Sequence, residues 1–259
     1  MVVEPSAATK AGRPRAMRRG PTVRPTVGAT ALAIVIATGM GLVAPSPLQA
    51  RAAGGPTQEL AQLLAPHKVR TAPNGRIKST TLPAWAPITG SATVLPVVGH
   101  ARTSNGITWL KVMLPGRPNS STGWIVKSAT RASTTAWRIE LRTSTRKIRV
   151  YRRGRLMRTF TVVVGKPSTP TPRGRFFVEE SILMPPGHAG APYALATSAR
   201  SNVLQEFDGG PGQIALHGVQ NLGGIPGTAV SHGCVRLADP AIRWLAARIS
   251  PGVPVTITG

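Results

Sequence analysis

The residues best suited to covalent chemistry lie near the C-terminus of the chain. Cys234 is the only cysteine among the 259 residues, and it lies within the stretch 231–237, which reads SHGCVRL. His217 lies seventeen residues before the cysteine and is followed by Gly218. A thiolate is a strong nucleophile, and a nearby imidazole can accept the thiol proton. The pattern therefore predicts a Cys-His site for acyl transfer.

Glycines beside this pair indicate how the backbone would position it. Gly233 lets the chain turn tightly before Cys234, and backbone N–H groups around that turn are candidate donors for the oxyanion of a tetrahedral intermediate. Gly218 removes bulk beside the His217 ring. An apolar run at 213–216 predicts a strand that ends at His217. We expect this strand to bring the histidine to the cysteine from an adjacent part of the chain.

The first fifty residues have the layout of a secretory signal. Arginines are frequent at 13–24, an uncharged apolar run covers 27–44, and residues 50–52 match an A-x-A cleavage pattern. The run is long enough to reach the lower limit for a bilayer span, so an uncleaved membrane anchor is the alternative. Either interpretation places the bulk of the chain outside the cytoplasm. A lone cysteine in an exported protein is an inert buried thiol, an intermolecular link or a reactive group.

The charge balance points to polyanionic partners. The chain has 32 Lys and Arg against 8 Asp and Glu, which gives a formal net charge of +24. Such an excess attracts polyanions. Aromatic residues make up only 4% of the chain, so stacking platforms for bases are scarce, and an exported protein rarely meets nucleic acid. We therefore expect anionic cell-wall polymers as partners and no nucleic acid; the alternative is that the charge serves solubility alone.

The pattern of short strands and turns predicts a mainly β fold in two blocks. Apolar or alternating runs at 92–98, 109–114 and 124–126 predict a small barrel over 82–130, with residues 54–81 as a linker that holds one short helix at 57–64. Residues 127–135 are expected to form a polar bridge to the second block.

The second block, 136–259, is predicted to be β-rich with one clear helix. Alternation is clearest at 137–142, and further strands are expected near 148–151, 160–164, 176–180, 194–197, 213–216 and 253–258. The helix is predicted over 239–249, with Asp239 as its N-cap and Pro240 at its first position.

Both blocks resemble known modules. His217-Gly218 and the stretch 231–237 resemble the signature of L,D-transpeptidases with a YkuD-like catalytic domain, and the pieces at 165–166 (GK), 171–174 (TPRG) and 192–195 (PYAL) support the resemblance over 137–258. The runs at 109–112 (WLKV), 115–118 (PGRP) and 123–125 (GWI) resemble a bacterial SH3-like module. The implied organisation is a signal peptide or anchor at 1–53, a linker at 54–81, an SH3-like module at 82–130 and a catalytic domain at 136–259.

The resemblance implies a role for each site residue. Cys234 would attack the carbonyl of the third residue of a peptidoglycan stem peptide and release D-alanine, with His217 as general base and His232 orienting the thiol. Ser231 and Gly233 would shape the turn, and Gly218 would leave room beside the base. Arg236 would bind a substrate carboxylate or hold a loop, and Tyr193 would line the groove or assist the oxyanion site. An amine from a second stem peptide would then complete a cross-link.

Several alternatives remain at this level. Water as the acceptor would make the same site a carboxypeptidase, and a protein amine would make it an enzyme that attaches proteins to the wall. A wall-binding protein without catalysis is a further possibility. Zinc ligation by His217, His232 and Cys234 lacks the accompanying pattern of a zinc site, so neither a metal nor another cofactor is expected. The oligomeric state is not indicated by the sequence.

Overall fold

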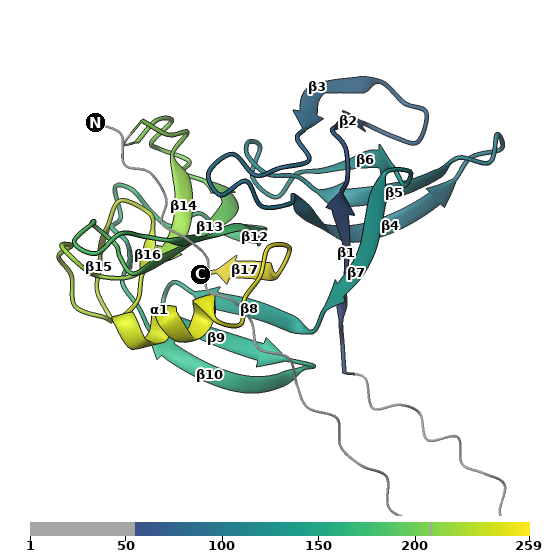
Figure 1. The fold of residues 1–259 in the computed structure, drawn as a ribbon. Coiled ribbons are helices and arrows are strands. Elements are labelled where there is room, and N and C mark those ends of the chain that lie inside the picture. The colour runs from purple at the N-terminus through teal and green to yellow at the C-terminus, as the bar shows by residue number, and fades with distance from the viewer. Residues whose placement is uncertain (1–54, 208) are drawn as a thin grey trace, which may run out of the picture. The chain divides into compact units, whose positions relative to one another are not determined.

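The computed structural model describes residues 55–207 and 209–259, and in this part of the chain the fold is mainly β with one helix (Figure 1). The prediction of a mainly β fold is confirmed. The first block contains β1 (Gln58–Leu63), β2 (His67–Arg70), β3 (Ile77–Leu82), β4 (Val94–Arg102), β5 (Thr108–Met113), β6 (Thr122–Val126) and β7 (Thr130–Thr135).

The second block contains the remaining strands and the helix. Its elements are β8 (Trp137–Arg142), β9 (Lys147–Arg152), β10 (Arg155–Thr161), β11 (Val164–Gly165), β12 (Gly174–Leu183), β13 (Tyr193–Arg200), β14 (Gln213–His217), β15 (Ala229–Ser231), β16 (Val235–Arg236), α1 (Asp239–Ala246) and β17 (Pro254–Thr258).

The seven strands of the first block form one sheet in the order β3-β2-β6-β5-β4-β1-β7. Its hydrophobic cluster includes Leu63, Leu95, Val112 and Ile125, which are almost completely buried. Phe177 of β12 belongs to the same cluster, so the first sheet packs against a strand of the second block.

The linker expected at 54–81 is wrong, because β1, β2 and β3 lie there and belong to this sheet. The helix expected at 57–64 is the strand β1, and the polar bridge expected at 127–135 contains β7, which pairs with β1 along its whole length. β1 is stabilised by pairing with the distant strands β4 and β7, whereas β2 and β3 pair with each other. The exposed polar residues of β3, which buries only Leu82, hide the usual alternation. The SH3-like character of this block stays a prediction.

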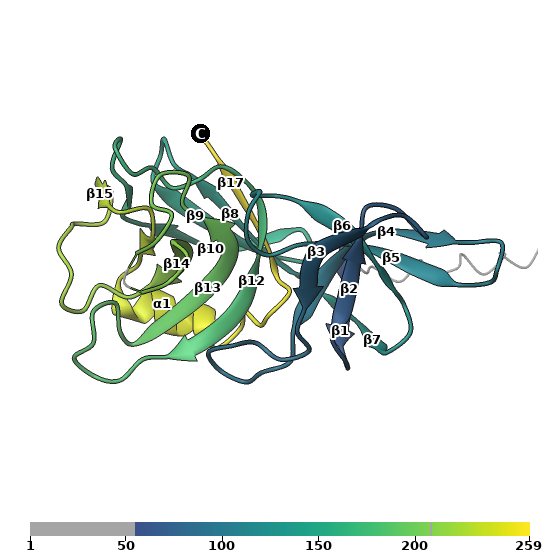
Figure 2. The same ribbon diagram turned by 90° about the horizontal axis from the view of Figure 1, so that it is seen from above.

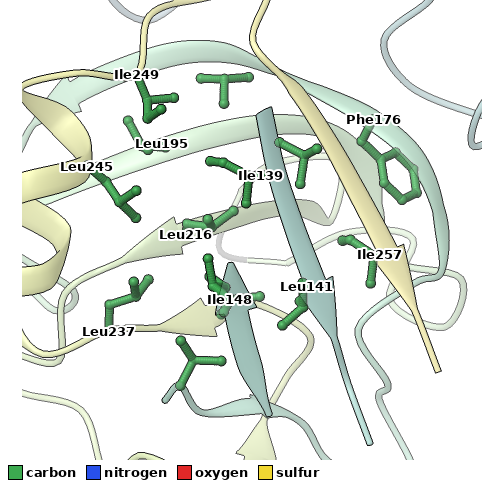
Figure 3. Close-up of a cluster of buried hydrophobic side chains, with 14 of the residues drawn as sticks. Ile139, Leu141, Ile148, Phe176, Leu195, Leu216, Leu237, Leu245, Ile249 and Ile257 are labelled. Carbon is green, nitrogen blue, oxygen red and sulfur yellow. The ribbon is translucent and has the colours of Figure 1, made fainter. Parts of the chain in front are cut away.

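The second block is built on an eight-stranded sheet in the order β10-β9-β8-β17-β12-β13-β14-β16. Neighbours are antiparallel except for the parallel pairs β17–β8 and β14–β16. One face of the sheet packs into a core that Figure 3 shows in close-up, with Ile139, Leu195, Leu216 and Ile257 among its labelled members. Fully burying such side chains contributes about 1.5–3 kcal/mol each.

The single helix, α1, covers this core. Ile242 and Leu245 are completely buried and belong to the same cluster as the sheet residues, and both ribbon views place α1 against the sheet (Figures 1 and 2). The predicted N-cap is wrong: Ala238 occupies that position, and Asp239 is the first helical residue. The Asp239 carboxylate instead accepts a hydrogen bond from the Gln220 side chain at 2.8 Å. Asp239 therefore ties the helix to the loop that follows β14.

The segment expected to act as signal or anchor lies outside the described residues. Within residues 55–207 and 209–259, no helix combines the length and apolar character that crossing a membrane requires.

Candidate active site

The parallel pairing of β14 with β16 brings the two halves of the sequence pattern together. Leu216 pairs with Val235, and His217 pairs with Arg236. Leu216 and Val235 are buried in the core. Because side chains alternate along a strand, His217 and Arg236 lie on the opposite face of the sheet, and Cys234, two residues before Arg236, lies on that face as well.

The Cys234 side chain is partly buried against β14. Its Sγ lies 3.5 Å from the backbone N of Ala215 and 3.8 Å from the carbonyl oxygen of Gln213. Burial raises the pKa of the Cys234 thiol, while the Ala215 N–H and the positive charge of Arg236 act in the opposite direction. The resting group is therefore a thiol that requires a base to become a nucleophile.

His217 has the properties of that base. Burial lowers the pKa of its imidazole, the hydrogen bond to Gly218 acts to raise that pKa, and the charge of Arg236 lowers it further. The Nδ1 atom lies 2.8 Å from the carbonyl oxygen of Gly218. A carbonyl can only accept, so Nδ1 carries the proton and Nε2 is left as the basic nitrogen.

Two glycines and a backbone hydrogen bond fix the His217 ring. A Cβ on Gly218 would lie 1.9 Å from the carbonyl oxygen of Ala191, so no other residue fits there without moving the backbone. A Cβ on Gly190 would lie 2.7 Å from Nδ1 of His217. The N–H of Gly218 donates to the carbonyl oxygen of Gly190 at 2.8 Å. The side of Gly218 that lacks a Cβ faces Ala191, whereas Gly190, which sequence reasoning missed, is the glycine that lies against the His217 ring.

Ser231 holds the turn before the cysteine. Its completely buried hydroxyl donates to the carbonyl oxygen of Cys234 at 2.6 Å and accepts from the N–H of Gly233 at 3.1 Å. Gly233 has φ of +124°, a conformation that residues with a Cβ rarely adopt. Ser231 and Gly233 therefore set the direction in which Cys234 leaves the turn.

Two buried threonines support the same turn from a distant loop. Thr169 donates its hydroxyl to the carbonyl oxygen of Ser231 at 3.2 Å, and Thr171 donates to that of Gly233 at 2.8 Å. Both side chains belong to residues less than 10% exposed. Thr171 lies in the stretch 171–174 that supported the family resemblance. Thr169 lies outside every such stretch, and the sequence did not indicate its role because its partner, Ser231, is 62 residues away.

Arg236 and Tyr193 lie beside the pair in the sheet. The Arg236 guanidinium donates to the carbonyl oxygen of Gly223, so it holds the loop after β14. Its Nε is buried without a partner among the described residues. Tyr193 begins β13, where the next residue, Ala194, pairs with His217, and its side chain packs against the core cluster.

His232 lies apart from this arrangement. Its side chain is exposed, and its ring stacks on that of Phe207, with centroids 5.4 Å apart and an interplanar angle of 29°. His217 therefore occupies the better position for a base, and Phe207 is a site neighbour that the sequence did not indicate. In the part of the chain that the structure describes, no group of three His, Cys, Asp or Glu residues has the arrangement of a metal site.

Comparison with known proteins assigns the second block. Residues 136–257 match the family model of the L,D-transpeptidase catalytic domain, YkuD. The L,D-transpeptidase YkuD of Bacillus licheniformis is 32% identical over 143 residues, which cover 55% of this chain and 78% of that protein. The YkuD protein of Bacillus subtilis strain 168 is 34% identical over 103 residues, which cover 40% of this chain and 54% of that protein.

Solved structures align at lower sequence identity. A crystal structure of an L,D-transpeptidase from Mycobacterium tuberculosis H37Rv aligns with 63% of this chain and 93% of its own, at 17% identity and a TM-score of 0.40. The assignment rests on the family model and the Bacillus licheniformis relative, of which more than two thirds is covered. On these grounds the chain belongs to the family of L,D-transpeptidases that share the YkuD catalytic domain.

Proposed function

We propose that this chain forms cross-links between the third residues of peptidoglycan stem peptides, using Cys234 as the nucleophile. The observation that carries the proposal is that the pairing of β14 with β16 puts Cys234 and His217 on the same face of the sheet. Family membership supports the reaction class, and a thiol with an imidazole on the same face of the sheet supplies the groups that such acyl transfer needs.

The first half-reaction consumes one stem peptide. Nε2 of His217 accepts the thiol proton as Sγ of Cys234 attacks the carbonyl carbon of the third residue. The bond from that carbon to the nitrogen of D-alanine breaks, and His217 returns the proton to the departing amine. The product of this step is a thioester on Cys234.

The second half-reaction transfers the acyl group. The amine of a neighbouring stem peptide attacks the thioester carbonyl, His217 accepts a proton from that amine, and the carbon–sulfur bond breaks to regenerate the thiol. Water in place of the amine yields the trimmed stem peptide, which is the carboxypeptidase outcome, and a protein amine yields an attached wall protein.

The surrounding residues have supporting roles in this proposal. The N–H of Cys234 is placed by the Ser231 and Gly233 turn and serves as the oxyanion donor. Arg236 favours the thiolate and disfavours the imidazolium, because its charge acts on both groups. Tyr193, which begins the strand next to that of His217, and the exposed stacked pair His232 and Phe207 are the neighbouring side chains proposed to contact the substrate.

Export is part of the same proposal. The basic and apolar layout of residues 1–53 is that of a secretory signal, and peptidoglycan lies outside the cytoplasm. The anionic wall polymers are proposed as additional partners because the net charge is +24.

Mass spectrometry of tetrapeptide muropeptides incubated with the full chain tests the function. We expect a dimer that is lighter by one alanine than two substrates, together with a transient protein mass increase located at Cys234. Cys234→Ser, which replaces the thiol by a hydroxyl, is expected to give neither the dimer nor the protein mass increase. A dimer of the same mass from Cys234→Ser would contradict the proposal, and tripeptide monomer alone from the wild type would assign trimming instead.

A further inference from the structure

On the side of the eight-stranded sheet that points away from the core, strands β8, β9 and β17 carry residues that the proposed reaction does not use. Ile139, Leu141, Ile148 and Val150 of β8 and β9 point into the core, so the residues between and beside them point outward. These outward residues, with their neighbours on β17, are Arg138, Glu140, Arg142, Lys147, Arg149, Thr256 and Thr258. We name them the basic face.

Strand register arranges these side chains in rows across the sheet. Arg142 pairs with Lys147 on β9 and with Thr258 on β17, and Glu140 pairs with Arg149 and Thr256 in the next row. Alternate residues along a strand are about 6.6 Å apart, and neighbouring strands are about 4.8 Å apart. The positive charges are therefore spread over an area too wide for them to converge on a single small anion. They suit a ligand that carries many negative charges.

The negative charge needed to balance this face is missing nearby. Residues 141–178 contain eleven Lys and Arg and no Asp or Glu. The one carboxylate of the basic face, Glu140, lies 3.0 Å from the Arg138 guanidinium and is paired with it. Arg142, Lys147 and Arg149 are exposed and have no carboxylate partner within residues 55–207 and 209–259.

The surface is also hollowed. A cavity of about 190 Å³ is lined by Glu140, Arg142, Lys147 and Arg149 with three threonines, among them Thr256. A second cavity of about 220 Å³ begins at Thr256 and continues past Arg138 towards residues 56–58. The two cavities share Thr256, and we call them together the trough; their lining includes residues of β9, β8 and β17.

The chemistry of the trough indicates its ligand. Guanidinium groups bind phosphate oxygens through two parallel hydrogen bonds, and threonine hydroxyls add further donors. The Glu140 carboxylate can accept hydrogen bonds from hydroxyls of a sugar or polyol unit between phosphates. The one aromatic ring on this face, Tyr151, is covered by Arg138, whose Cζ lies 4.0 Å from the ring centroid, so a nucleic acid base finds no free ring for stacking.

We propose that the basic face binds a linear wall polymer whose phosphodiester groups repeat along its length, and so retains the enzyme at its substrate. The proposal relies on the export component of the proposed function, but not on the reaction of Cys234. In the strand order of the sheet, β13, β12 and β17 separate β14 from β8. Polymer binding and catalysis therefore use separate surfaces.

Binding of inorganic polyphosphate to the full chain tests this inference without any turnover. The variant Arg142→Gln/Lys147→Gln/Arg149→Gln removes three charges from the basic face. The matched control, Lys68→Gln/Arg102→Gln/Arg131→Gln, removes three exposed charges from the first sheet. We expect the first variant to bind at least about tenfold more weakly in low salt, with the slope of log affinity against log salt reduced by about 2, because each phosphate contact contributes about 0.7. The control is expected to stay within about threefold of wild type.

Other outcomes would overturn the inference. Equal losses in the two variants would show that net charge alone attracts the polymer. Equal wild-type affinity for polygalacturonate, a carboxylate polymer, would remove the preference for phosphate, and tighter binding to phosphatidylglycerol vesicles than to polyphosphate would assign the face to a membrane. Because none of these measurements involves turnover, an inactive wild type would contradict the proposed reaction and leave this inference standing.

Discussion

The two ends of the eight-stranded sheet place their ionisable side chains in opposite environments. At the β14–β16 end, Cys234 and His217 are surrounded by protein, and burial shifts the pKa of each group towards its neutral form. At the β9–β8 end, Arg142, Lys147 and Arg149 are exposed and keep their charge in solvent. The same sheet thus carries the side chains proposed to exchange a proton, Cys234 and His217, at one end. At the other end it carries the exposed cationic side chains of Arg142, Lys147 and Arg149.

This difference shows why burial matters for the chemistry. A buried thiol and a buried imidazole gain little from forming an ion pair in advance, because the charged forms are poorly solvated. The proton transfer then accompanies attack on the substrate. A side chain can therefore carry a long-lived charge only at the exposed end of the sheet.

Removing the base at the buried end should have the largest effect. His217→Gln keeps a polar side chain beside Gly218 but removes the basic nitrogen. We expect kcat/KM for cross-linking to fall by about 10²–10⁴, the usual contribution of a general base. His232→Gln is the matched control, because its ring is exposed and stacks on Phe207. A larger loss for His232→Gln than for His217→Gln would exchange the roles of the two histidines.

The turn that presents the nucleophile should be the next most sensitive feature. Ser231→Ala leaves the N–H of Gly233 and the carbonyl of Cys234 without their side-chain partner. The expected cost is about 1–3 kcal/mol in the free energy of unfolding, measured by urea denaturation. Ser133→Ala, on an exposed position of β7, is expected to change it by less than about 0.5 kcal/mol. Similar losses in both variants would contradict a special role for the Ser231 hydroxyl.

The pH profile tests the environment of the base directly. In the proposed reaction neutral His217 accepts the thiol proton, so activity should fall as pH decreases through the pKa of its imidazole. Because burial lowers that pKa, the midpoint of the acid limb of kcat/KM is expected below 6.5, the ordinary value for histidine. A midpoint above 6.5 would mean that His217 is stabilised in its charged form, which contradicts the buried, neutral environment.

The exposed end of the sheet should contribute least to turnover. Arg142→Gln/Lys147→Gln/Arg149→Gln is expected to leave kcat/KM on a soluble stem peptide within about twofold of wild type, because these side chains are exposed and far from β14 in the strand order. A fall of tenfold or more on the soluble substrate would show that the two ends are coupled. The measurement needs only steady-state rates with both proteins at one salt concentration.

The sequence predicted the centre of the site because its chemistry lies in short, local motifs. The strand at 137–142 was also predictable, because Ile139 and Leu141 alternate with polar residues. β1 was missed because its pairing partners, β4 and β7, lie far along the chain. β3 was missed because it buries a single side chain and shows no alternation. Thr169 and Gly190 were missed for the same reason as β1: their contacts with Ser231 and His217 exist only after folding.

The solitary, partly enclosed Cys234 also has a consequence for the durability of the protein. Peroxides oxidise thiolates, and the sulfenic acid that results is usually rescued by condensation with a second thiol. This chain has no second thiol, so a first oxidation at Cys234 would progress towards irreversible acids. By keeping the group protonated, burial slows that first oxidation. The enclosure that makes a base necessary in the proposed reaction would thus also protect the thiol from oxidation.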